Sequence, residues 1–227
     1  MKKFFHNIYN FFYVAINWNL PLAIFITWHE IKRGPKYNVN TIKPVSLEAL
    51  TIAEGDISKS SPYEALNYYI LETLLENFRK LFPSEKSILD IGSGKGRVLV
   101  VAAHYGFKNI TGVDFARELC AAAKRNINKI KAQFRDTTFT IYCKDILNYT
   151  IDKSDKVFFL YNPFNNEIME KLLEKIDRSV KEHSRTIYFI YANPQQKEVL
   201  LQKGYTEVFS IKKLRLLEGV ILLKQSG

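Results

Sequence analysis

The stretch ILDIGSGKGRVLVVAAHYG, residues 88–106, decides the fold of this chain. The short apolar run 87–91 predicts a buried strand, and an acid, Asp90, lies among its hydrophobic residues. Three glycines then follow at alternate positions: Gly92, Gly94 and Gly96. Helical spacing of apolar residues predicts a helix over 96–105. A glycine-rich turn between a strand and a helix lets a ligand approach main-chain N–H groups at the helix N-terminus.

Strands and helices alternate through the rest of the chain. Beyond the first strand and helix, strands are expected over 109–114, 138–143, 156–161 and 185–192, and helices over 115–132, 165–183 and 194–203. Two more strand-like runs, 205–212 and 216–224, have no helical pattern between them. Regular alternation predicts a parallel sheet covered on both faces, and the closing pair predicts an antiparallel hairpin. The expected fold is therefore α/β, a Rossmann-like seven-stranded sheet, mostly parallel.

The first 59 residues are predicted to form a helical extension and linker, ahead of a domain over 60–227. From Phe4 to Trp28 no side chain carries a fixed charge. We expect two short helices here, the second capped by Asn19 and ended by Gly34-Pro35, and then a polar linker. Ser60-Ser61-Pro62 predicts the start of another helix, which runs to about residue 80.

The first of these helices is weakly amphipathic. Its polar residues (His6, Asn7, Asn10, Asn17) fall on one side at 100° per residue, and its apolar residues (Phe5, Ile8, Phe12, Ile16) lie opposite. Residues 1–33 are accordingly a candidate for peripheral membrane contact, for packing against the domain, or for contact with a second subunit. The stretch lacks the small-residue cleavage site of a signal peptide.

Charge and cysteine content set the remaining limits. The chain of 227 residues has a net charge of +10, and residues 87–227 carry most of the excess, with 23 basic and 15 acidic side chains. This excess indicates either a solvated lysine-rich surface or a field that attracts nucleic acid or an anionic membrane. Cys120 and Cys143 have no metal-type spacing and indicate reduced core residues of a cytoplasmic protein.

The spacing of the glycines selects among nucleotide-binding turns. A P-loop is absent, because no Gly-Lys-Ser/Thr follows the first glycine at the required distance. A dinucleotide fingerprint needs glycine at its sixth position, where this chain has Arg97. The remaining pattern, an acid followed by three alternate glycines, is present throughout DIGSGKG.

With this pattern the sequence resembles the class I S-adenosylmethionine-dependent methyltransferases over 60–227. The resemblance implies S-adenosyl-L-methionine as the cofactor, with its amino-acid end at Asp90 and the three glycines. It implies that an acid at the end of the second strand, Asp114 in ITGVDFA, binds the ribose hydroxyls beside Phe115. In TIYCKDIL it places Asp145 at the adenine amino group and Ile146 against the ring. The segment SSPY resembles the start of lysine methyltransferases and their bacterial relatives, in which an aromatic such as Tyr63 closes over the cofactor.

The end of the fourth strand suggests where the acceptor reacts. Asn162-Pro163-Phe164 resembles the Asn/Asp/Ser-Pro-Pro-aromatic signature of nitrogen methyltransferases but lacks one proline. The resemblance implies that these three residues orient the target amine, and that Asn162 also borders the cofactor; the alternative is a strand end that turns the chain. The expected function is methyl transfer to a nitrogen of a protein or small molecule. An RNA methyltransferase that uses the basic half, and a cofactor-binding protein without catalysis, remain alternatives.

Overall fold

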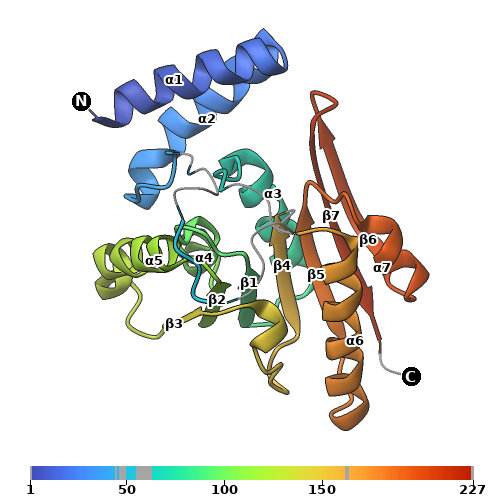
Figure 1. Cartoon of the computed structure of the whole chain (residues 1–227). Helices are drawn as coiled ribbons and strands as arrows, with labels where there is room; N and C mark the ends of the chain where they lie inside the picture. Colours follow the sequence, from blue (N-terminus) through green and yellow to red (C-terminus); the bar gives the residue numbers. More distant parts are fainter. Residues whose placement is uncertain (1, 44, 46–49, 55–62, 162–163, 226–227) are drawn as a thin grey trace.

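The computed structural model describes residues 2–43, 45, 50–54, 63–161 and 164–225. Seven strands form one sheet in the order β3-β2-β1-β4-β5-β7-β6 (Figure 1). Strands β1 to β5 are parallel, and β7 is antiparallel to both β5 and β6. This confirms the predicted fold. The strands are β1 (Ser87–Ile91), β2 (Asn109–Asp114), β3 (Thr138–Cys143), β4 (Val157–Tyr161), β5 (Ile187–Ala192), β6 (Thr206–Lys213) and β7 (Leu217–Lys224).

Helices cover both faces of the sheet, as the apolar central strands require. β1, β4 and β5 are buried on both faces, which explains why they read as continuous apolar runs. One core lies under α3, α4 and α5, and the other under α6 and α7. These helices are α3 (Tyr68–Leu81), α4 (Arg97–His104), α5 (Arg117–Ile130), α6 (Asn166–Glu182) and α7 (Lys197–Gln202).

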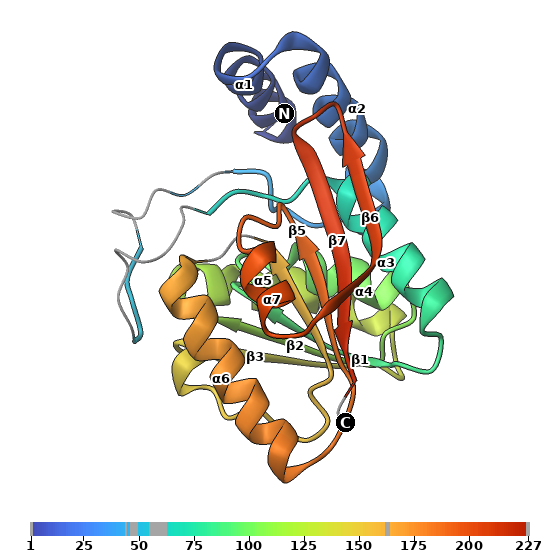
Figure 2. The same ribbon diagram turned by 90° about the vertical axis from the view of Figure 1, so that its right-hand side faces the viewer.

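The N-terminal residues form a helical hairpin beside the turn between β6 and β7 (Figure 2). Its helices are α1 (Lys2–Asn17) and α2 (Leu20–Tyr37), and Asn19 caps α2 as expected by accepting a hydrogen bond from the N–H of Leu22. The expected end of α2 at Gly34-Pro35 is wrong. Although Pro35 removes one backbone hydrogen bond, the helix continues to Tyr37 before Asn38 ends it in the left-handed region. Within the described residues, no helix combines the length and hydropathy that a membrane span needs.

The helix expected from residue 60 begins later, at Tyr68. Asn67 caps it by accepting a hydrogen bond from the N–H of Tyr69 (2.8 Å). Ahead of this helix, Tyr63 forms an isolated antiparallel bridge with Val45. The predicted start at Ser60-Ser61-Pro62 lies outside the described residues.

A buried ion pair joins the helical hairpin to the domain. Arg97, the first residue of α4, binds both carboxylate oxygens of Glu30 in α2, and the two side chains are 3% and 5% exposed. The same guanidinium donates to the Leu66 carbonyl (2.7 Å) and to Thr41 Oγ1 (2.8 Å). Of the three predicted placements of the extension, the structure therefore shows α2 packed against the domain.

Part of the expected linker also belongs to the sheet's carboxyl edge. Ala53 donates its N–H to the carbonyl of Phe115 (2.8 Å), and Arg117 donates to the carbonyl of Thr51 (3.0 Å). Residues 50–54 thus lie against the turn between β2 and α5. The polar composition of the predicted linker did not indicate this contact with the edge of the sheet.

Candidate cofactor site

The glycine turn is held by the ends of β1 and β2. Gly92 and Ser93 donate their N–H groups to the Val113 carbonyl at 2.9 and 3.1 Å. Gly92 and Gly94 have positive φ angles of 72° and 53°, which side chains other than glycine rarely adopt. The sharp turn brings the N–H of Gly94 to Asp114, where it donates to Oδ2 at 2.8 Å.

The Tyr63 ring lies against this turn. A Cβ atom at Gly94 would come within 2.3 Å of Tyr63 Cε2, so only glycine fits beneath the ring. The Tyr63 hydroxyl donates to the carbonyl of Thr41 (2.8 Å), and Lys95 Nζ lies 4.7 Å from the ring centroid. The structure thus places the predicted aromatic of the SSPY segment directly on the glycine turn.

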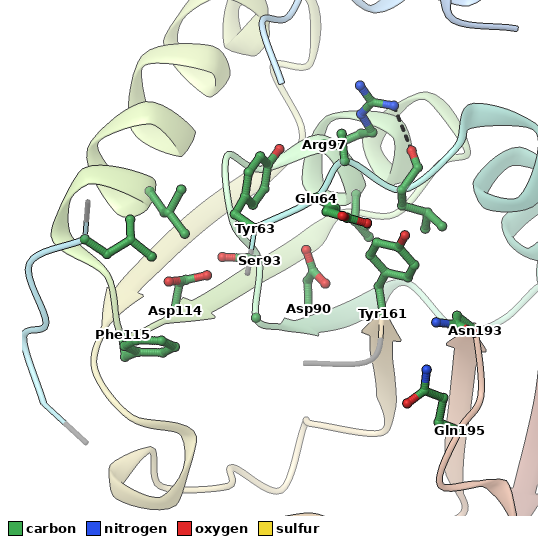
Figure 3. A pocket seen from close by; sticks show the side chains of 16 residues that line it. Tyr63, Glu64, Asp90, Ser93, Arg97, Asp114, Phe115, Tyr161, Asn193 and Gln195 are labelled. Carbon is green, nitrogen blue, oxygen red and sulfur yellow. Dashed lines mark hydrogen bonds between the residues drawn. The ribbon is translucent and has the colours of Figure 1, made fainter. Parts of the chain in front are cut away.

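A cavity of about 320 Å³ opens at this edge of the sheet. It lies at the carboxyl ends of β1, β2 and β4, where ligands of open α/β sheets bind. Figure 3 shows Asp90, Glu64 and Tyr161 grouped on one side and Asp114 and Phe115 on the other. Of the predicted cofactor residues, the structure brings five to its wall: Tyr63, Asp90, Gly92, Asp114 and Phe115.

Two polar atoms in the cavity wall have no partner within the described chain. Asp90 is 2% exposed and its Oδ2 makes no hydrogen bond; the hydroxyl of Ser93 is likewise buried and unpaired. Burial, followed by repulsion from Asp114, raises the pKa of Asp90 well above its usual range. A buried carboxylate without a partner is costly, and an ammonium group is the natural donor for it. The amino-acid end of S-adenosylmethionine carries such a group, so these residues fit the cofactor.

Asp114 presents a second carboxylate to the same cavity. Burial raises its pKa to about 6, although the N–H groups of Ala116 and Gly94 hold its two oxygens and act against that rise. A carboxylate oxygen can accept more than one hydrogen bond, so Asp114 can also receive a ribose hydroxyl while it anchors the turn. Asp114 is thus fixed by backbone contacts before any ligand arrives.

Three other predicted residues, Asp145, Ile146 and Phe164, are not part of the described cavity wall. Asp145 caps the short helix η4 (Ile146–Asn148) by accepting from Leu147 N–H at 2.8 Å, and Ile146 packs into the core under α6. Phe164 is also buried in that core and is not part of the described cavity wall. Asn162 and Pro163 lie outside the described residues. The adenine contact of Asp145 and the acceptor role of Asn162-Pro163-Phe164 therefore stay predictions.

Sequence reasoning missed several residues of the wall. Tyr161 ends β4, while Asn193 and Gln195 follow β5, and all three line the cavity. Asn193 adopts a φ of 49° and donates its N–H to the Glu218 carbonyl (2.9 Å). An asparagine at a strand end was the available signal, because asparagine tolerates this conformation. Among the described residues, no group of three or more His, Cys, Asp or Glu side chains is placed to hold a metal ion.

Comparison with known proteins agrees with this geometry. Residues 88–183, from β1 through α6, match the family model described as a methyltransferase domain. This match, together with the strand order and the acid–glycine turn, supports a class I S-adenosylmethionine-dependent methyltransferase domain. S-adenosylmethionine is the cofactor of this domain, and a similar fold has been solved with it bound: magnesium protoporphyrin IX methyltransferase from Synechocystis (TM-score 0.51, 13% identity, 68% of this chain and 77% of that one).

Two further similarities concern acceptors of different kinds. Human EEF1A lysine methyltransferase 2 is 30% identical over 139 residues, which cover 57% of this chain and 56% of that protein. A putative RNA methyltransferase from Pyrococcus horikoshii has a TM-score of 0.53 at 15% identity, over 79% of this chain and 94% of that one. The chain spans little more than half of the curated relative it matches, and the structural likeness shows the fold alone. The methyltransferase domain is common to all of them, and the acceptors differ.

Proposed function

We propose that the chain transfers a methyl group from S-adenosylmethionine to a nitrogen of a protein or small-molecule acceptor. The cofactor supplies a methyl group on a sulfonium, whose leaving group is already good. The chain's own residues therefore need mainly to align a nucleophile and to exclude water. The observation that supports the proposal most is the pair of buried acids, Asp90 and Asp114, on one glycine turn.

Binding is the first test of this proposal. We expect S-adenosylmethionine and S-adenosylhomocysteine to bind the purified chain in calorimetry and NAD not to bind. Asp114→Ala removes the acceptor of charged hydrogen bonds worth about 1.5–3 kcal/mol each, so affinity should fall ten- to a thousandfold. Tight NAD binding would instead indicate an oxidoreductase.

Methyl transfer is the second test. The chain is incubated with S-adenosylmethionine labelled in its methyl group and with fractions of a cell extract. Label that is found in protein or in small amines supports the proposal, whereas label that ribonuclease removes indicates the RNA alternative. Cofactor binding without transfer to any fraction would indicate a non-catalytic binding protein.

We further propose that residues 1–33 contact an anionic membrane surface, because the apolar stripes of the helical hairpin face outward. Ile8, Phe12 and Ile16 form one exposed stripe of α1, with Ile16 80% exposed, and Leu20, Ile24 and Trp28 form another on α2. The apolar face that the sequence indicated for the first helix thus points to solvent. Before residue 48 the only acid of the sequence is Glu30, which is paired with Arg97, while six basic side chains occur there. Apolar and tryptophan side chains flanked by cations suit an anionic lipid interface.

Deleting residues 1–33 is a poor test of membrane contact, because it would also leave Arg97 buried without Glu30. Ile16→Asp and Ile24→Asp change exposed side chains instead, and should abolish co-sedimentation with phosphatidylglycerol vesicles while stability changes little. Val208→Asp, at an exposed apolar site on β6, is the matched control. Undiminished sedimentation of both hairpin variants would refute the contact.

A further inference from the structure

A second cavity of about 360 Å³ adjoins the cofactor cavity. It lies between the helical hairpin of α1 and α2 and the beginning of β7, the two segments that Figure 2 shows side by side. The two cavities have these lining residues in common: Glu64, Ala65, Leu66, Arg97, Tyr161, Asn193 and Gln195. A molecule in the second cavity would thus touch the same side chains that border the cofactor.

The outer wall of the second cavity is apolar and aromatic. Tyr13 and Trp18 line it, together with Leu22 from α2 and Leu217 from β7. Val14, Leu22 and Ala23 form a small core of their own, against which Leu217 packs. This packing holds the hairpin to the sheet and fixes the wall, so the cavity is a consequence of the N-terminal extension.

The charge of the second cavity is acidic at its junction with the first. Arg97 is the only basic side chain among its described lining residues, and Glu30 neutralises it. Glu218 pairs with Lys212 at the outer end. Glu64 remains, on the wall common to both cavities, and partial burial raises its pKa. Beside it, burial and then the Glu64 charge raise the pKa of Tyr161 to about 12, so this phenol stays neutral.

We propose that the second cavity is the acceptor site, and that it takes an amine carried on an apolar body, with the ammonium opposite Glu64 and the apolar body against Tyr13 and Trp18. This rests on the proposed nitrogen methyltransferase function and names its substrate class. An ammonium gains from a nearby carboxylate, and an apolar body gains from burial against aromatic side chains. A nucleic-acid strand would need unpaired cations for its phosphates, and the described wall offers none.

The same arrangement provides for the proton that an ammonium must lose. The ammonium gives one proton to the Glu64 carboxylate, which leaves a neutral amine with a free lone pair. The lone pair then forms the nitrogen–carbon bond as the carbon–sulfur bond breaks and its electron pair stays on sulfur. The products are a methylated ammonium and S-adenosylhomocysteine. A carboxyl group with a raised pKa suits the role of proton acceptor at neutral pH.

The proposal can be tested through tryptophan fluorescence. The chain has two tryptophans, of which Trp18 lines the second cavity, while Trp28 is 60% exposed and is not part of its described wall. Trp28→Phe therefore leaves one reporter in the cavity. The probes are decylamine, decanol and decanoate below their micellar concentrations. We expect decylamine to change the fluorescence of Trp18 saturably and to bind with an affinity at least tenfold higher than that of decanol. Decanoate should bind most weakly of the three.

The charge contribution is isolated by Glu64→Gln, which should lower decylamine affinity about tenfold and leave decanol affinity unchanged. Glu218→Gln is the matched control, since Glu218 lines the same cavity but is already paired. Equal affinities for decylamine and decanoate, or an equal loss in the two variants, would overturn the proposal. Calorimetry with S-adenosylhomocysteine is run on the same variants. In the chain without these substitutions, cofactor binding with no amine preference refutes the acceptor class alone, whereas absence of cofactor binding refutes the proposed function.

Discussion

The ion pair between Glu30 and Arg97 should be among the most sensitive points of this structure. Both side chains are at most 5% exposed, and Glu30 is the acid that neutralises the guanidinium. Burial by itself would lower the pKa of Arg97, but the adjacent Glu30 carboxylate raises it above its ordinary value. In Glu30→Ala the guanidinium stays charged and buried without its partner. Breaking such a pair costs about 3–5 kcal/mol.

This loss is measured as the change in the free energy of unfolding in urea, followed by circular dichroism. For a chain of this size, a loss of 1 kcal/mol in the free energy of unfolding lowers the midpoint of thermal unfolding by about 2–4 °C, so the midpoint of Glu30→Ala should fall by about 6–20 °C. Glu76→Ala is the control, because it breaks an exposed pair with Lys80 and should cost less than about 1 kcal/mol. The double variant Glu30→Met/Arg97→Met should be more stable than Glu30→Ala, since no charge then remains buried. A loss below about 1 kcal/mol in Glu30→Ala would refute the reasoning.

Three further predictions concern the cofactor turn. Gly94→Ala should reduce cofactor affinity in calorimetry at least tenfold, because the new Cβ would overlap Tyr63 and the φ of 53° is strained for alanine. Gly204→Ala controls for backbone strain alone, because Gly204 has a φ of 86° and open space around the position of a Cβ. Cofactor affinity should fall as the pH drops below about 6, by up to tenfold per unit, because Asp114 must be ionised to accept the ribose hydroxyls and its raised pKa puts protonation in that range. A flat titration between pH 7 and 5 would contradict that role. Asp90→Asn should weaken S-adenosylmethionine binding tenfold or more. Thermal stability should be kept or improved, since the substitution removes a buried carboxyl group that has no partner. A drop in stability with unchanged affinity would show a structural role for Asp90 instead.

The sequence determined the sheet and the glycine turn because both depend on local patterns. Apolar runs five or six residues long between helical repeats predict parallel strands. Alternate glycines after an acid predict a turn that only glycine can make, and the observed φ angles at Gly92 and Gly94 show why. The acids Asp90 and Asp114 were found for the same reason, since each ends or nearly ends a strand whose position the pattern fixes.

The tertiary structure alone decided how the extension meets the domain. Nothing local to Glu30 or Arg97 signals that residues 67 positions apart would form one buried pair. The sequence left open what the helix face around Ile16 contacts; in the structure this face is exposed, because the helical hairpin buries Val14, Leu22 and Ala23 against Leu217 instead. Long-range packing outweighs the amphipathic pattern of a single helix. The second cavity arises from that packing, and for this physical reason its residues leave no contiguous motif in the sequence.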